Sequence, residues 1–235
     1  MNKKMILKDW ADLPRFMRVS EVRPYYEVLN RNRTGLVWKR RFDFLLANFM
    51  LVVLAIPMMV IAGLIRLDSP GPAFYRQERV TTYGKRFQIH KFRTMINNAD
   101  KTGTAVTVAG DSRVTRIGKV LRKYRLDELP QLIDIINGDM SFVGTRPEVV
   151  KYVRQYTPEM CATLLMPAGV TSEASIRYKE ESELLNKAED VDSTYIHDIL
   201  PAKMKWNLDS IKKFRFEREV VTMIRTIFAV MGKEY

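Results

Sequence analysis

Residues 44–65 read FLLANFMLVVLAIPMMVIAGLI and contain no charged side chain. As a straight helix this run would be about 33 Å long, which is roughly the thickness of the hydrocarbon core of a bilayer. The plain interpretation is therefore a helix that spans a membrane once.

Three features of this run oppose a plain span. Pro57 lies inside it, where a proline kinks a helix, and Asn48 would place a polar amide in lipid. Basic residues also flank both ends, whereas a spanning helix usually has its lysine and arginine bias on one side. The alternative is a helix that bends at Pro57, enters one leaflet and returns to the cytoplasmic face. The residues alone leave both topologies open.

The composition points to an anionic partner. The chain has 235 residues, 46% of them hydrophobic, a formal net charge of +12 and a single cysteine, Cys161. Such a charge suits nucleic acid, anionic lipid or a phosphorylated substrate. Aromatic residues are not interleaved with the basic ones as base-stacking platforms require, so we expect no nucleic acid. The lone cysteine fits a reducing compartment, and the polar first forty residues do not resemble a secretory signal.

The pattern predicts a mostly α fold with a few short strands (α+β). Strands are expected at 74–75 and 87–95, joined through 82–85, with another at 105–108. Helical spacing follows at Ile117, Val120, Leu121 and Tyr124 and again from Leu129 to a stop at 137–138. The expected organisation is a polar extension at 1–38, a membrane helix at 39–67, a catalytic domain at 68–200 and an amphipathic helical region at 201–235.

The C-terminal region has two interpretations. Val220, Ile224, Ile227 and Met231 follow helical spacing and are surrounded by basic residues. One interpretation is an ordinary amphipathic helix that packs this stripe on the core. The other is an interfacial helix that rests on anionic lipid.

Asp127 and Glu128 are the strongest candidates for chemistry. Pro130 suits the first turn of a helix, and Leu129 before it is expected to be extended. The two carboxylates would then precede a helix N-terminus, which favours phosphate, and would point in different directions. One could face a reacting phosphorus while the other binds Mg²⁺. The alternative is structural: Asp127 caps the helix and Glu128 pairs with an arginine.

Several stretches, in order, resemble the bacterial sugar transferases, which are monotopic polyprenyl-phosphate phosphoglycosyl transferases. The matching strings are Lys39–Asp43, Ser69–Pro72, Lys91–Met95, Arg122 with Leu126–Gln131, and Gly138–Pro147. Any one of them is weak, but five in the same order are specific.

The resemblance implies transfer of a sugar-1-phosphate from a UDP-sugar to polyprenyl (undecaprenyl) phosphate, with release of UMP, as the first membrane step of a surface glycan pathway. It implies that Asp127 is the nucleophile, that Glu128 helps to bind Mg²⁺, and that a re-entrant helix bent at Pro57 holds the enzyme on the cytoplasmic face of the bacterial inner membrane. It places further basic residues around the substrate: Lys91, Arg93, Arg122 and Arg146. A homo-oligomer is allowed by the sequence.

The chain departs from the family pattern at two places. Ile56 precedes Pro57 where the family often has serine, and Thr145 lies where a proline is common. Residues 167–172 also differ, at a position where sugar selection could occur. Two other functions are retained as alternatives: a basic membrane-anchored scaffold that binds lipid or nucleic acid, and a conventional Asp-x-Asp glycosyltransferase that uses Asp190 and Asp192 and releases UDP.

Overall fold

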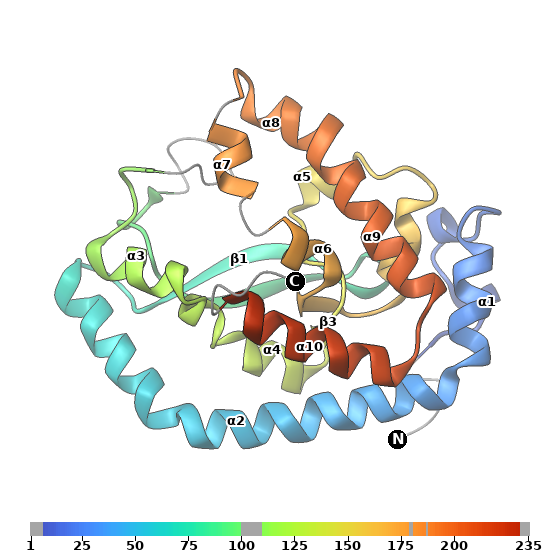
Figure 1. Ribbon diagram of the computed structural model, residues 1–235, viewed down its shortest axis with the longest axis horizontal. Helices are drawn as coiled ribbons and strands as arrows, with labels where there is room; N and C mark the ends of the chain where they lie inside the picture. Colours follow the sequence, from blue (N-terminus) through green and yellow to red (C-terminus); the bar gives the residue numbers. More distant parts are fainter. Residues whose placement is uncertain (1–6, 100–109, 179–180, 187, 231–235) are drawn as a thin grey trace.

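A long helix lies along one side of the molecule, and the remaining elements are assembled against it (Figure 1). The computed structural model describes residues 7–99, 110–178, 181–186 and 188–230. Most of the described residues are helical, and the strands are few and short, as the sequence predicted. The strand expected at 105–108 lies outside the described residues.

The long helix is α2, which runs from Arg33 to Asp68 and contains the apolar run. Pro57 lies inside it, and the helix bends along its course toward its C-terminal end (Figure 1). Its outward side chains are apolar and exposed: Phe44, Leu45, Phe49, Val52, Val53, Ile56, Met59, Val60, Leu64 and Leu67. The inward side contributes Ala47, Met58 and Ile65 to the core. A continuous exposed surface of this kind is typical of a membrane or partner contact.

Polar contacts attach the beginning of α2 to the domain. Lys39 Nζ donates to Val143 O at 2.8 Å, and Arg40 donates to the C-terminal carbonyls of Ile135 and Ile136. The buried Asp43 carboxylate accepts from Ser141 Oγ at 2.7 Å. The cationic side chain of Arg40 is well placed there, because helix C-termini carry partial negative charge.

The other end of α2 is attached to the same domain. Asp68 Oδ2 accepts from the backbone N–H of Ile117 at 3.0 Å. Arg93 donates to the carbonyl oxygens of Ser69 and Pro70, just beyond the helix end. Both ends of the apolar segment therefore remain in contact with one folded body.

Two small sheets form the centre. β1 (Phe74–Val80) and β2 (Arg86–Phe92) pair antiparallel across a turn at Thr82–Gly84, where Tyr83 and Gly84 have positive φ. This confirms the predicted hairpin, although its first strand is longer than expected. β3 (Met140–Val143) and β4 (Ala168–Thr171) pair in parallel. Gly144 and Gly169 lie so close that a Cβ on Gly169 would be 2.1 Å from Gly144 N.

Helices α3 (Arg116–Lys123) and α4 (Gln131–Asn137) follow the hairpin. In α3 only part of the predicted apolar stripe is buried: Leu121 is 3% exposed, while Val120 and Tyr124 are about half exposed. Helix α3 instead packs through Gly118, which has no side chain and so allows the helix to lie against the Thr94 carbonyl oxygen. Gly138 ends α4 in the left-handed conformation, which confirms the predicted stop.

The other elements complete the domain around this centre. They are 3₁₀ turns at Trp10–Asp12, Arg15–Met17 and Met160–Leu165, helices α1 (Arg23–Arg31), α5 (Val150–Val153), α6 (Glu173–Arg177), α7 (Glu181–Asn186) and α8 (Val191–Thr194), a π-helical turn at Tyr195–Ile199, and helices α9 (Leu200–Lys212) and α10 (Phe216–Val230). The N-terminal segment packs into the core through Leu13, Met17, Tyr25 and Leu29 against the 160–165 turn and α9.

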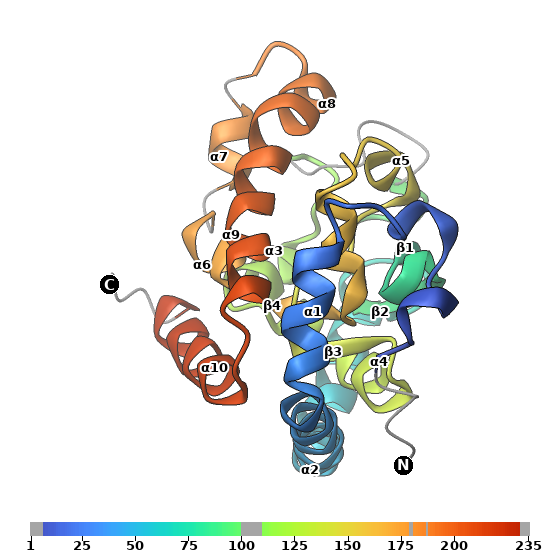
Figure 2. The same ribbon diagram turned by 90° about the vertical axis from the view of Figure 1, so that its right-hand side faces the viewer.

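Helix α10 lies beside α2 (Figure 2) and exposes most of its apolar stripe. Val221, Ile224, Ile227 and Val230 are 40–59% exposed, and Thr222 is its buried residue. Of the stripe predicted from the sequence, Ile224 and Ile227 are exposed, Val220 is half-buried and Met231 lies outside the described residues. The interpretation that the stripe packs on the core is therefore wrong for its described part. Phe216 packs edge-on against Phe42 of α2, and Glu219 pairs with Lys39, so polar and aromatic contacts attach the helix instead.

Candidate active site

Asp127 and Glu128 lie in a 3₁₀ turn, Leu126–Glu128, directly before α4. Leu129 and Pro130 are also in the right-handed helical region, so the extended geometry predicted for Leu129 is wrong. The disfavoured conformation before proline is offset because Leu126 and Leu129 pack on the core of Phe92 and Leu121. Asp127 and Glu128 are therefore neighbours on a helical turn, not on an extended segment.

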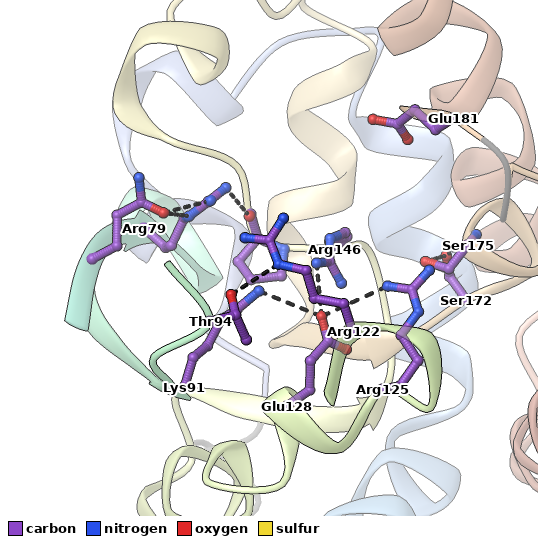
Figure 3. A network of polar contacts seen from close by, with 12 residues as sticks. Arg79, Lys91, Thr94, Arg122, Arg125, Glu128, Arg146, Ser172, Ser175 and Glu181 are labelled. Atoms are coloured by element: carbon purple, nitrogen blue, oxygen red, sulfur yellow. Dashed lines mark hydrogen bonds and ion pairs between the residues drawn. The ribbon is translucent and has the colours of Figure 1, made fainter. Parts of the chain in front are cut away.

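Three cations surround the Glu128 carboxylate (Figure 3). Its Oε1 atom lies 2.8 Å from Arg146 Nη2, 3.4 Å from Lys91 Nζ and 3.8 Å from Arg125 Nη1. These residues come from the loop after β3, from β2 and from the residue before the 3₁₀ turn. Arg125 itself has a positive φ of 57°, a conformation that costs a non-glycine residue about 1 kcal/mol and that is frequent at functional sites.

Asp127 has a different environment from its neighbour. The residue is only 9% exposed, and its Oδ1 atom has no hydrogen-bond partner. Gln131 follows one helical turn later, is 1% exposed, and has no partner for either amide atom. Residues four apart on a helix share a face. Buried polar atoms without partners are rare, so this face has hydrogen-bonding capacity available for a ligand.

The surroundings of the two carboxyl groups shift their pKa values in opposite directions. Burial, then the charge of Glu128, raises the pKa of Asp127. Burial alone would raise the pKa of Glu128 as well, but Arg146, Lys91 and Arg125 outweigh it and hold that pKa well below its usual range. Burial and the nearby Arg146 lower the pKa of Lys91 to about 8. Glu128 is thus a fixed anion within a cationic pocket.

The remaining predicted residues divide into two groups. Arg122 Nε donates to Thr94 Oγ1 at 2.8 Å (Figure 3). Burial lowers the pKa of Arg122, and the charge of Asp127 opposes that shift. Arg93 is not brought to the Glu128 cluster: it is 5% exposed, and its guanidinium contacts backbone carbonyls at the end of α2.

Sequence reasoning missed two residues of the site. The sequence assigns neither Arg125 nor Gln131 to the site, although Gln131 ends the matching string Leu126–Gln131. The helical period was the available signal for Gln131, because it lies four residues after Asp127.

The two carboxylates suit a hard cation that takes its remaining ligands from substrate phosphates and water. Within the described part of the chain, no group of three His, Cys, Asp or Glu side chains is placed to hold a metal. Mg²⁺ commonly takes one or two carboxylates and fills its remaining positions with phosphate oxygens and water. The unpartnered Asp127 Oδ1 beside Glu128 fits that requirement.

The Asp-x-Asp string has structural roles. Asp190 Oδ1 accepts from the Ser193 N–H and caps α8, and Asp192 pairs with Lys151 and accepts from Tyr152. Its carboxylates are therefore occupied.

Residues 34–233 match the profile of a family described as bacterial sugar transferase. The chain belongs to this family. It is 35% identical over 82% of its length to a UDP-N-acetylgalactosamine-undecaprenyl-phosphate N-acetylgalactosaminephosphotransferase from Aeromonas hydrophila, of which it covers 43%. It is 34% identical over 83% of its length to a UDP-glucose:undecaprenyl-phosphate glucose-1-phosphate transferase from Caulobacter vibrioides, of which it covers 70%. A protein of that same description from Escherichia coli is 37% identical over 68% of the chain, which covers 36% of it.

Proposed function

We propose that this chain transfers a sugar-1-phosphate from a UDP-sugar to undecaprenyl phosphate or a similar polyprenyl phosphate, through a covalent intermediate on Asp127. The relatives' names carry the substrate classes, and they differ in the sugar, N-acetylgalactosamine in one and glucose in others. The observation that carries the proposal is the unpartnered Asp127 oxygen beside a Glu128 that three cations hold in place.

The proposed reaction has two displacements at one phosphorus. An Asp127 carboxylate oxygen attacks the phosphorus that bears the sugar, and the P–O bond to UMP breaks with its electron pair leaving on UMP. A phosphate oxygen of the polyprenyl phosphate then attacks the same phosphorus. The acyl-phosphate P–O bond breaks, the Asp127 carboxylate is regenerated, and a polyprenyl diphosphosugar is formed.

The chain's own residues bind and orient the diphosphate. Arg146, Lys91 and Arg125 supply positive charge around the reacting phosphates, and Arg122 approaches from α3. Glu128 holds these cations, so that they do not form ion pairs with the Asp127 oxygen that acts as the nucleophile. Mg²⁺ bound by Asp127 and Glu128 would neutralise charge on the phosphate oxygens.

We further propose that α2 enters and leaves the membrane on the cytoplasmic face of a bacterial inner membrane. Both of its ends contact the same domain, while its outward side chains are apolar and exposed. A helix that left the domain to cross the bilayer would have one end free of these contacts. The exposed stripe of α10 would lie in the same interface.

The nucleotide product tests the reaction class. Membranes containing the protein, supplied with Mg²⁺, a polyprenyl phosphate and a panel of UDP-sugars, should release UMP with one or a few of the sugars. Release of UDP would identify a conventional glycosyltransferase. A protein that binds lipid but releases no nucleotide with any donor would be a membrane-anchored scaffold.

A further inference from the structure

A cavity of about 420 Å³ lies between α6, α9 and α10. These three helices lie on one side of the molecule, and α10 is the one of them that lies beside α2 (Figure 2). The cavity reaches the surface, since Trp206 and Val221 in its wall are 37% and 46% exposed. Among the residues described, its lining includes Thr145, the residue before Arg146, but none of Lys91, Glu128 and Arg146, so the cavity adjoins the candidate active site without containing these three residues.

The charge of the cavity wall is not balanced. All three lining acids are matched with cations: Asp209 with Lys213 at 2.8 Å, Glu173 with Arg225 at 3.3 Å, and Glu219 with Lys39. Three arginines of the wall, Arg177, Arg215 and Arg218, form no ion pair within the described ranges. The rim therefore has excess positive charge, which favours an anionic ligand.

The interior supplies a hydrogen-bonding group. Asn207 lines the cavity and is 5% exposed, and its Oδ1 atom has no partner. Its Nδ2 atom makes one long contact, 3.9 Å to Met204 Sδ, which leaves amide N–H capacity for a ligand. A buried amide without adequate partners is costly unless something else satisfies it.

One wall of the cavity continues into an apolar surface. Val221 belongs both to the lining and to the exposed stripe of α10, which includes Ile224 and Ile227. Phe216 of α10 packs on Phe42 of α2, so this stripe adjoins the helix with the apolar outer face. A ligand with an anionic head and an apolar tail matches this sequence of surfaces.

We propose that this cavity binds the phosphate headgroup of an anionic phospholipid and so fixes α10 against the membrane surface. Arg215 and Arg218 contact the phosphate, Asn207 Nδ2 donates to it from the interior, Asn207 Oδ1 accepts from a headgroup hydroxyl, and the acyl chains lie along the α10 stripe. Arg177 stacks on Trp206, 3.8 Å from the ring centroid, and closes the outer edge. This site goes beyond the proposed transfer reaction and does not depend on it.

The test measures phospholipid binding to a catalytically inactive variant, so that the result does not depend on the transfer reaction. Asp127→Asn protein in a neutral detergent is heated with increasing dihexanoyl phosphatidylglycerol or dihexanoyl phosphatidylcholine. Phosphatidylglycerol should raise the unfolding temperature to a plateau, and phosphatidylcholine should not. Replacing Arg215 and Arg218 with Gln should weaken the apparent affinity at least about tenfold, because the charge-assisted hydrogen bonds from both guanidinium groups to the phosphate are lost.

A matched control removes the same charge elsewhere. Arg15→Gln with Arg154→Gln should leave the affinity unchanged, and Arg215→Lys with Arg218→Lys should retain most of it. Equal responses in the two Gln variants, or equal stabilisation by both lipids, would overturn the proposal. A third titration uses farnesyl phosphate. If it alone stabilises the protein, and the cavity variant loses that effect, the cavity belongs to the polyprenyl acceptor and the phospholipid assignment fails.

Discussion

Arg146 Nη2 lies 2.8 Å from Glu128 Oε1, and this contact joins the loop after β3 to the turn before α4. The carboxylate is 7% exposed in its side chain and the guanidinium 31%. The pair fixes which of two adjacent carboxylates is engaged. Glu128 is held by cations, and the adjacent Asp127 keeps an oxygen free for a reacting group.

Removing the Glu128 charge should destabilise the protein as well as inactivate it. Glu128→Gln leaves Arg146 and Lys91 close together without a counter-charge, and breaking a buried pair in this way costs about 3 kcal/mol. Thermal unfolding in detergent measures the loss. Glu78→Gln is the control, since its pair with Arg86 is exposed and should be worth less than about 1 kcal/mol. Equal unfolding temperatures for the two variants would contradict the role of the cluster.

Lys91 should impose an alkaline limit on donor binding. Its pKa is lowered to about 8, so its ammonium is present below that pH and is lost as the pH rises through it. The kcat/KM for the UDP-sugar, measured from UMP release at donor concentrations below KM, should therefore fall above about pH 8. Lys91→Arg keeps a positive charge at every pH in this range and should move the limit upward. An unchanged alkaline limb in that variant would assign it to another group.

Gly118 should not tolerate a side chain. A Cβ there would lie 2.1 Å from the Thr94 carbonyl oxygen, and Thr94 also receives the Arg122 hydrogen bond. Gly118→Ala should push α3 away from Thr94, in the segment after β2, lower stability by about 2 kcal/mol and reduce transfer. At Gly63 no atom lies within 4 Å of a Cβ, so Gly63→Ala should be neutral or slightly stabilising. If Gly118→Ala is as stable as Gly63→Ala, α3 is not packed against Thr94 as described.

The re-entrant topology predicts that the chain segments before and after α2 are both on the cytoplasmic side of the membrane. Single cysteines at Ser20 and Asn97, both exposed, are placed in a Cys161→Ala background. An impermeant maleimide should label neither in cells with a permeabilised outer membrane and both after lysis. Labelling of one of them in intact cells would restore a spanning helix.

Local patterns predicted the elements that local forces determine. The hairpin follows from two short strands joined through residues 82–85, and the end of α4 follows from Gly138. The neighbouring pair Asp127 and Glu128 could be selected because carboxylates beside an N-terminal turn have a recognisable use. The site assignments themselves remain predictions.

Contacts over long sequence separations do not follow from local patterns. The family resemblance placed Lys91 and Arg146 near the substrate, and both contact Glu128. It placed Arg93 there as well, but Arg93 contacts the end of α2 instead. The helical geometry of Leu129 reflects its packing on a core formed by distant residues, which overrides the local preference before proline. The exposure of the α10 stripe also depends on what the rest of the fold leaves uncovered.

The most direct measurement of the central claim is covalent capture on Asp127. Protein supplied with Mg²⁺ and a UDP-sugar labelled in the sugar, without polyprenyl phosphate, should become labelled and should release about one equivalent of UMP. Asp127→Asn should not be labelled, while Asp190→Asn, at an exposed aspartate that caps α8, should be labelled like the parent protein. Peptide mapping should place the label on Asp127. Labelling and turnover that persist in Asp127→Asn would contradict the account.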